Sequence, residues 1–222
     1  MTSLNWSDPP SQTAFPVAKA GYPFIYASIF VTVVFALLGV GPLAVLGLFT
    51  TGCVCCFFRD PDRLIPTGEG IVVSPADGKV IKVESIEQTP YYNAPCYRIS
   101  VFMSVFNVHV NRIPHEGTIR QVRYHPGKFF SANLDKASKE NEHNALLLEG
   151  PSGKQVGFVQ IAGLVARRII CTVQPGDVIK RGQRFGLICF GSRLDIYLPR
   201  STEIAVAVGQ KVQAGSSILG RW

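Results

Sequence analysis

The chain has 222 residues, enough for one packed domain with an appendage. Only 17% of the residues are charged, below the ~25% that is usual for soluble domains. The net charge is +7, and all of this excess lies in residues 59–222, because residues 1–58 hold one Asp and one Lys. This positive charge forms no stripe interleaved with aromatic residues, so we expect no nucleic-acid partner.

An uncharged run of 39 residues, Ala20–Phe58, follows a short tail at 1–19. One spanning helix needs ~20 apolar residues, and the apolar region of a signal peptide has only ~7–15. Glycine and proline at 39–42 favour a turn. We therefore predict two apolar helices, Tyr22–Leu38 and Leu43–Phe58, as a membrane-anchoring hairpin over 20–58. A hairpin that only dips into the bilayer, a single kinked span and a buried helical pair are the alternatives.

Positive residues flank this run, with Lys19 before it and Arg59 and Arg63 after it. Because positive charge marks the cytoplasmic side, we expect an inner-membrane protein whose domain at 59–222 faces the cytoplasm. A basic domain tethered there is expected to be drawn to anionic lipid headgroups. The six cysteines lack zinc-like CxxC spacing, and we expect reduced thiols and no metal site.

Short β-rich segments separated by Gly and Pro turns fill the rest of the chain, which is typical of an all-β sandwich or barrel. The expected strands are Gly70–Ser74, Gly78–Glu84, Tyr97–Phe102, Gly117–Tyr124, Ala145–Leu148, Gln155–Ile161, Ile169–Val173, Arg184–Phe190 and Leu194–Leu198. The polar stretch Gly127–Asn144 is expected to be a long loop with one helical turn.

A weak internal repeat relates Gly176–Gly182 to Gly209–Gly215, since each segment has two glycines six residues apart with a valine between them. The segment Ala76–Val80 is a looser partner. Glycine-bounded hairpins of this kind resemble the biotinyl/lipoyl-type hybrid sandwich. The predicted fold is therefore mainly β, a β-sandwich of the barrel-sandwich-hybrid type, with an N-terminal apolar helical hairpin.

A Gly-Ser pair, Gly191-Ser192, interrupts the apolar segments Leu187–Phe190 and Leu194–Leu198. A Gly-Ser pair alone indicates a turn. Between two apolar strands, however, the glycine carbonyl is open to close approach and the serine hydroxyl lies next to it. Attack of Oγ on that carbonyl would give an ester, and elimination would then give dehydroalanine, which hydrolyses to a pyruvoyl group and ammonia.

Several motifs occur in order along nearly the whole chain. They are Phe57–Pro61, Ser74–Gly78, Phe106–Arg112, Pro126–Phe129, Asn141–Asn144, Gln160–Ile169 and Phe190–Arg193. Together they are far more specific than any one of them alone, and they resemble the short bacterial and archaeal form of the phosphatidylserine decarboxylases.

The resemblance implies a proenzyme that cleaves itself between Gly191 and Ser192. The products would be a β chain, 1–191, and an α chain, 192–222, that begins with a pyruvoyl group made from Ser192. This group would form a Schiff base with the serine headgroup of phosphatidylserine and release CO2, leaving phosphatidylethanolamine. Neither pyridoxal phosphate nor a metal is then required. Assembly into a homo-oligomer stays open.

The same resemblance implies catalytic roles for Asp77 and His109. Asp77 would orient or deprotonate the Ser192 hydroxyl, although Asp-Gly is also a common hairpin turn. His109 would handle the proton at the substrate α-carbon. Longer relatives carry a second histidine where this chain has Arg112, so either His109 serves both steps or Asp77 acts more directly. His115, His125 and His143 are expected to lie on the surface.

Other residues are candidates for contacts with the lipid. Arginine binds phosphate in a bidentate manner, and the candidates are Arg112, Glu142, Arg167, Arg168 and Arg193. Phe129-Phe130 is either a membrane-touching or substrate-covering lid, or a loop packed on the core. The alternatives to a phosphatidylserine decarboxylase are an archaetidylserine decarboxylase and a non-enzymatic lipoyl- or biotinyl-like carrier with Lys79 at a hairpin tip. A zinc peptidase and a decarboxylase of soluble amino acids fit less well.

Overall fold

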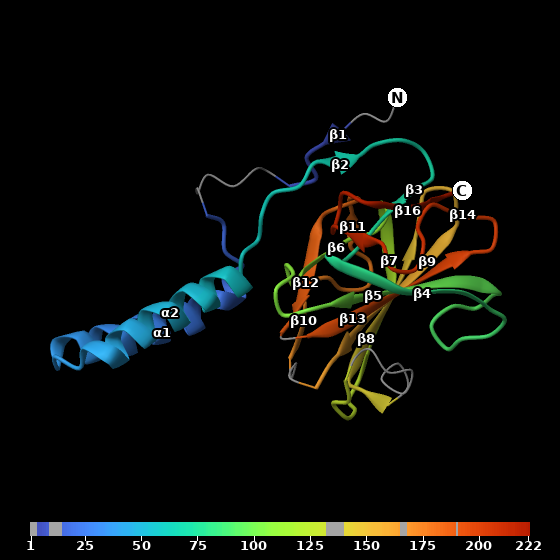
Figure 1. Ribbon diagram of the computed structural model, residues 1–222. Helices are drawn as coiled ribbons and strands as arrows, with labels where there is room; N and C mark the ends of the chain where they lie inside the picture. The colour runs from blue at the N-terminus through green and yellow to red at the C-terminus, as the bar shows by residue number, and fades with distance from the viewer. Residues whose placement is uncertain (1–3, 9–14, 132–139, 165–167, 190) are drawn as a thin grey trace. The chain divides into compact units, whose positions relative to one another are not determined.

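The computed structural model describes residues 4–8, 15–131, 140–164, 168–189 and 191–222 (Figure 1). The chain divides into two compact units. Residues 11–62 form the hairpin unit, and residues 1–10 with 63–222 form the β unit. The mainly β architecture with an N-terminal helical pair confirms the fold class expected from the sequence.

The hairpin unit holds a short 3-10 helix, η1 (Lys19–Gly21), and two α-helices, α1 (Tyr22–Leu37) and α2 (Gly41–Phe57). Gly39 turns the chain between the α-helices with φ +71°, a conformation that favours glycine. The helices approach closely at Gly47, where an added Cβ would lie 2.6 Å from Oγ1 of Thr32. Small residues allow such close packing of apolar helices. Among the described residues, one helical stretch, Lys19–Leu37, is long and apolar enough to cross a membrane.

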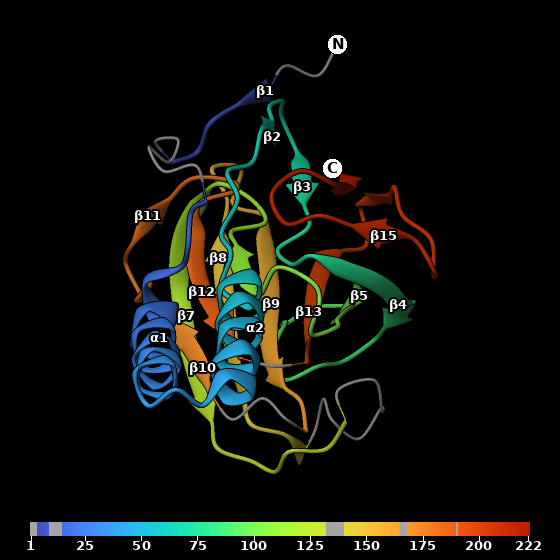
Figure 2. The ribbon, with the colours of Figure 1, turned by 60° about the vertical axis from the view of Figure 1, so that its left-hand side comes forward.

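The β unit is built on an eight-stranded antiparallel sheet, in which each neighbouring pair is hydrogen-bonded. Its strands, in spatial order, are β11 (Val178–Ile179), β7 (Gly117–His125), β8 (His143–Glu149), β9 (Gln155–Ala162), β13 (Ser192–Pro199), β5 (Cys96–Met103), β4 (Gly78–Ile86) and β15 (Lys211–Val212). Figure 2 shows this sheet strongly twisted, with β13 near its centre.

The described residues of the β unit also form two three-stranded sheets and one two-stranded sheet. One three-stranded sheet contains β10 (Ile169–Cys171), β12 (Arg184–Ile188) and β6 (Val110–Arg112). The other contains β14 (Glu203–Ile204), β16 (Ile218–Arg221) and β3 (Ile71–Val73). The two-stranded sheet pairs β1 (Leu4–Asn5) with β2 (Ile65–Pro66).

The main core lies between the large sheet and the three-stranded sheets, as the alternation of β13 shows. Leu194, Ile196 and Leu198 join a buried cluster that also contains Phe185 of β12 and Leu219 of β16. The residues between them on β13 point to the opposite face. A second, smaller cluster covers that face, where Tyr92 and Cys96 pack against Tyr197. Both faces of β13 are therefore buried.

Strand direction brings several chain segments to one end of the large sheet. Ser192, the first residue of β13, pairs with Met103 at the end of β5 and with Ala162 at the end of β9. Because all neighbours are antiparallel, β4, β8 and β13 begin at this end, and β5, β7 and β9 finish there. We call this the site end.

Candidate active site

Two chain crossings meet at the site end. One is residues 104–109, which lead from β5 in the large sheet to β6 in the β10–β12–β6 sheet. The other leads back from β12, through Cys189 and Gly191, to β13. The backbone N–H of Gly191 donates a hydrogen bond to Nε2 of His109 over 3.4 Å. The fold therefore brings His109 into contact with Gly191, the residue before Ser192.

The His109 imidazole is held in one orientation. Its side chain is fully buried, and its Nδ1 lies 2.9 Å from the carbonyl oxygen of Asn107. A carbonyl only accepts, so Nδ1 carries the proton and Nε2 presents its lone pair toward Gly191. The Asn107 side chain fixes the turn by accepting hydrogen bonds from the N–H and the hydroxyl of Ser104. A neutral histidine oriented in this way can accept a proton.

Ser192 is fully buried, and its hydroxyl donates to the Met103 sulfur over 3.4 Å. A thioether is a weak acceptor, so turning the hydroxyl toward another group costs little. Gly191 has φ +65°, and nothing lies within 4 Å of the position where a Cβ would be. This conformation favours glycine.

A chain of buried amides leads to the same sulfur. Asn144 donates to Gln160 over 3.2 Å, Gln160 donates to Asn111 over 2.9 Å, and Asn111 donates to Met103 over 3.8 Å. The sequence interpretation did not single out these amides. Gln160 between Val159 and Ile161 was the available signal, because a polar side chain inside an apolar strand needs a buried partner.

Asp77 immediately precedes β4 and lies at the site end. Its Oδ2 accepts from Arg63 over 2.8 Å, and its Oδ1 accepts from the backbone N–H of Ala214 over 2.7 Å. Strand β5 lies between β4 and β13. Two strand spacings of ~4.8 Å therefore separate the start of β4 from Ser192. The described bonds of Asp77 hold the turn before β4.

The β unit repeats this turn. Pro114-His115-Glu116 precedes Gly117, the first residue of β7, as Pro75-Ala76-Asp77 precedes Gly78, the first residue of β4. Glu116 accepts two hydrogen bonds from Arg181, at 2.8 and 2.6 Å. Burial alone would raise the pKa of Glu116, but these bonds lower it below its ordinary value. A carboxylate thus anchors the turn in both halves of the fold.

Two of the predicted lipid-binding arginines have partners inside the β unit. Arg193 is buried, and its Nη2 donates to Oδ2 of Asp195 over 3.0 Å. Arg112 donates to the carbonyl of Gly182 over 2.9 Å and lies 3.8 Å from the Asp8 carboxylate. Strand alternation points Arg112 to the face of β6 opposite Asn111. Neither guanidinium is directed at Ser192 by these contacts.

The other predicted lipid-binding residues lie in the segments around the site end. Arg168 is exposed, and its carbonyl accepts from the N–H of Cys189 over 3.1 Å. Arg167 lies outside the described residues. Glu142 is half-buried, and its charge contributes, after desolvation, to raising the pKa of Tyr124. Through this hydrogen bond, the backbone of Arg168 contacts the crossing that carries Gly191.

Two histidines are not on the surface, which corrects the expectation from their neighbouring turn signals. His115 is 3% exposed and His143 is 6% exposed, whereas His125 is exposed as predicted. Nε2 of His143 lies 2.8 Å from the Tyr91 hydroxyl, and its Nδ1 lies 2.7 Å from the carbonyl of Asn141. Burial lowers the pKa of both buried histidines. Turn signals mark chain reversal, and here the covering segments lie far away in sequence.

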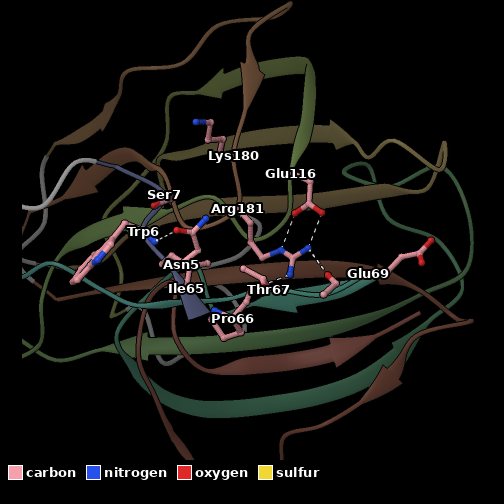
Figure 3. Close-up of a pocket in the computed structure, with 11 residues that line it drawn as sticks. Asn5, Trp6, Ser7, Ile65, Pro66, Thr67, Glu69, Glu116, Lys180 and Arg181 are labelled. Atoms are coloured by element: carbon pink, nitrogen blue, oxygen red, sulfur yellow. Dashed lines mark hydrogen bonds and ion pairs between the residues drawn. The ribbon is translucent and has the colours of Figure 1, made fainter. Parts of the chain in front are cut away.

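A cavity of about 500 Å³ lies away from the site end, beside β1, β2 and the start of β7 (Figure 3). Arg181 forms its polar wall and donates to Glu116 and to the carbonyls of Pro66 and Gly68. These bonds occupy the guanidinium, so we assign Arg181 a structural role. Among the described residues, no cluster of three or more His, Cys, Asp or Glu side chains could hold a metal ion.

Comparison with known proteins agrees with this geometry. A family model described as phosphatidylserine decarboxylase matches residues 50–220. The chain belongs to the phosphatidylserine decarboxylase family. The proenzyme of Syntrophus aciditrophicus is 50% identical over 92% of this chain and 96% of its own length. The proenzyme of Desulfotalea psychrophila is 45% identical over 95% and 98%.

Both relatives bear the name phosphatidylserine decarboxylase proenzyme, and their family is one of carboxy-lyases. This membership confirms the resemblance drawn from the motifs. Lys79, which a carrier domain would present at a hairpin tip, instead pairs with Phe102 and Lys211 inside the large sheet.

Proposed function

We propose that this chain is a phosphatidylserine decarboxylase that activates itself by cleaving its own Gly191–Ser192 bond. The observation that carries the proposal is the position of this peptide. It joins two strands of different sheets, and the His109 imidazole lies against its glycine. Cleavage would give a β chain, 1–191, and an α chain, 192–222.

The first step is attack of the Ser192 hydroxyl on the Gly191 carbonyl carbon. The hydroxyl proton goes to a base, the Gly191–Ser192 C–N bond breaks, and the freed amine takes up a proton. Loss of the Ser192 α-proton then expels the Gly191 carboxylate from the ester. The resulting dehydroalanine tautomerises, and water replaces its nitrogen, which leaves as ammonia. Oxygen, nitrogen and protons balance without an oxidant.

We propose His109 as the base in both self-cleavage and turnover. Its Nε2 faces the Gly191 N–H, and the Asn107 carbonyl keeps the proton on Nδ1. Asp77 lies across β5 from Ser192, and its described hydrogen bonds come from Arg63 and from the backbone N–H of Ala214. These contacts favour an indirect role for Asp77, in which it positions the start of β4 beside Met103. Arg112 then need not replace the second histidine of longer relatives.

The residues around Ser192 fit a pyruvoyl group. Ser192 begins a strand that is paired on both sides, so residue 192 would be held in place as a chain terminus. The Asn111 amide, whose described donor bond goes to a thioether, can donate to a carbonyl there instead. When formed, the group would supply an electron-withdrawing carbonyl that binds the substrate amine and stabilises charge as CO2 leaves. His109 would then move the proton at the substrate α-carbon.

The substrate is proposed to reach the site from a membrane. Helices α1 and α2 expose large apolar side chains along their length, such as Phe30 at 69% and Phe49 at 70%. In water such exposure is unfavourable, whereas a bilayer would cover it. The flanking positive charges favour the inner membrane, with the β unit on the cytoplasmic side.

Mass spectrometry under denaturing conditions tests self-cleavage. The purified chain should give two fragments that meet between 191 and 192, with the smaller one lacking a free α-amino group at its N-terminus. Ser192→Ala should give one intact chain that releases no CO2 from phosphatidylserine vesicles. Ser201→Ala, at an exposed serine just after β13, is the matched control and should cleave normally. Two fragments from Ser192→Ala would contradict the proposal.

Paired substitutions separate catalysis from turn anchoring. His109→Ala should slow cleavage by roughly 10²- to 10⁴-fold, the usual contribution of a general base. Asp77→Asn and Glu116→Gln each remove a charge from one of the two equivalent turns. If Asp77 positions the site, Asp77→Asn should slow cleavage while Glu116→Gln leaves it unchanged. Equal cleavage in both variants would assign Asp77 a purely structural role.

A further inference from the structure

We propose that the site end of the β unit carries its own membrane-docking rim, separate from the helical hairpin. Its apolar residues are Val105, Phe106, Tyr124, Phe130 and Leu164, and its partner is a lipid bilayer that contains anionic headgroups. The inference rests on the proposed function, because a decarboxylase of a membrane lipid must bring its site to the bilayer surface.

Exposed apolar side chains gather at the site end. Eight large apolar side chains are exposed among the described residues of 63–222, and five of them are in the rim. Phe106 is 83% exposed and Leu164 is 61% exposed. Single exposed apolar side chains are common on protein surfaces. Several of them at one end of a sheet indicate an interaction surface.

Strand direction places the rim residues together. Phe106 lies in the crossing that follows β5, and Leu164 lies in the segment that follows β9. Tyr124 is the last residue but one of strand β7, and Phe130 is in the chain between β7 and β8. Strands β5, β7 and β9 all finish at the site end. Figure 2 shows the chain leaving the lower ends of β7 and β9 on the same side of the sheet.

Charge favours a bilayer as the partner. Exposed cations accompany the apolar residues. Arg123 lies beside Tyr124, and Arg168 is close behind Leu164 in the chain. Lys128 lies over the Phe130 ring at 5.7 Å and also pairs with Glu140 over 3.3 Å. Apolar residues interleaved with cations suit the interface of an anionic membrane, where both groups find partners. The whole excess of +7 lies in 59–222, and the same chain carries the exposed apolar hairpin.

The rim also explains how a buried residue can meet a lipid headgroup. Phe106 is three residues from His109, and Leu164 follows the strand whose last residue, Ala162, pairs with Ser192. Insertion of these loops to a depth of roughly 5–10 Å, as interfacial segments insert, would bring headgroups level with the crossings. The substrate would then pass from the bilayer to the site without entering bulk water.

Tryptophan quenching tests insertion without any requirement for activity. The full chain carrying Phe106→Trp or Leu164→Trp is reconstituted in vesicles of phosphatidylglycerol and phosphatidylcholine with brominated acyl chains. Val178→Trp is the matched control, because Val178 is also 83% exposed but pairs with the start of β7, away from the site end. Relative to the wild-type signal of Trp6 and Trp222, the emission added at 106 and 164 should be quenched and that added at 178 should not. Equal quenching at all three positions, or none at 106 and 164, would overturn the rim.

Kinetics provide the second test. Phe106→Ser/Leu164→Ser should lower the rate on long-chain phosphatidylserine in vesicles by about tenfold, since losing two inserted side chains weakens docking at least that much. Its rate on monomeric short-chain phosphatidylserine should match the wild type. Val178→Ser/Val208→Ser, with similar exposure, should leave both rates unchanged. Loss of both rates in the rim variant would assign these residues to the site itself and overturn the rim. An inactive wild type would contradict the proposed function, and quenching would still decide the rim.

Discussion

Replacing Asp195 with alanine should destabilise the β unit more than any surface substitution. Asp195 is fully buried and Arg193 is 3% exposed, with Nε 2.9 Å from Oδ1 and Nη2 3.0 Å from Oδ2. Removing one partner of a buried pair costs about 3–5 kcal/mol, because the other charge stays buried. Asp195 also helps, after burial, to raise the pKa of Tyr197, and its charge raises that of Arg98 against the effect of burial.

The expected shift is large enough to measure by thermal unfolding. For a domain of this size, each 1 kcal/mol lowers the Tm by about 2–4 °C, so Asp195→Ala should lower it by roughly 6–20 °C. The measurement uses the full chain in detergent, in a Ser192→Ala background, so that cleavage does not differ between variants.

Two controls isolate the buried pair. Arg193→Met/Asp195→Leu removes both charges and fills the space, and it should recover most of the loss. Glu149→Ala breaks the solvent-screened pair with Arg120 and should leave the Tm nearly unchanged. A Tm for Asp195→Ala no lower than that of Glu149→Ala, or a double variant no better than the single one, would refute the reasoning.

Three further predictions follow from the packing. Burial lowers the pKa of His115 and His143, so the unfolded chain binds more protons than the folded chain below pH ~6.5. The stability should therefore fall as the pH drops through this range. In Tm measurements from pH 7.5 to 5.5, His143→Gln should flatten this dependence. Gly186→Ala would place a Cβ 2.2 Å from the Ile170 carbonyl oxygen, and it should lower the free energy of unfolding in urea by about 1–3 kcal/mol. The control is Gly52→Ala, whose Cβ would meet nothing within 4 Å and which should not lower this free energy. Asn111→Leu removes the amide that links Gln160 to Met103, and it should slow cleavage about tenfold in a time course on denaturing gels. This corresponds to ~1.4 kcal/mol lost in positioning the groups around Ser192. An unchanged rate would remove the amide chain from the mechanism.

Local patterns predicted much of the fold. The helices at Tyr22–Leu37 and Gly41–Phe57 lie within two residues of the predicted ends, because an apolar run and a Gly-Pro turn are local signals. The glycine repeat is also confirmed. Gly176 and Gly209 have φ +97° and +95°, and Gly182 and Gly215 both have φ +77°. The two repeats carry β11 and β15, which lie on opposite edges of the large sheet.

Contacts between distant segments were beyond local patterns. The sequence placed Gly191-Ser192 between two strands, but it could not show that these strands belong to different sheets. Nor could it show that Arg193 faces Asp195, because their separation of two residues puts them on one strand face only if the strand is regular. His143 appeared polar and exposed, yet Tyr91, far away in the chain, covers it.

The location of the proposed cleavage explains how the fold can survive it. A break inside β13 would interrupt hydrogen bonding with both β5 and β9, whereas a break before Ser192 leaves all of β13 and β12 intact. The 31 residues from 192 to 222 would stay bound, because β13 lies between β5 and β9, β15 pairs with β4, and β16 pairs with β3. Each of these partners belongs to the 1–191 fragment. The Gly191–Ser192 bond lies in a crossing between sheets, so it can be broken at little structural cost. The residue after it would stay fixed near His109, Met103 and Asn111.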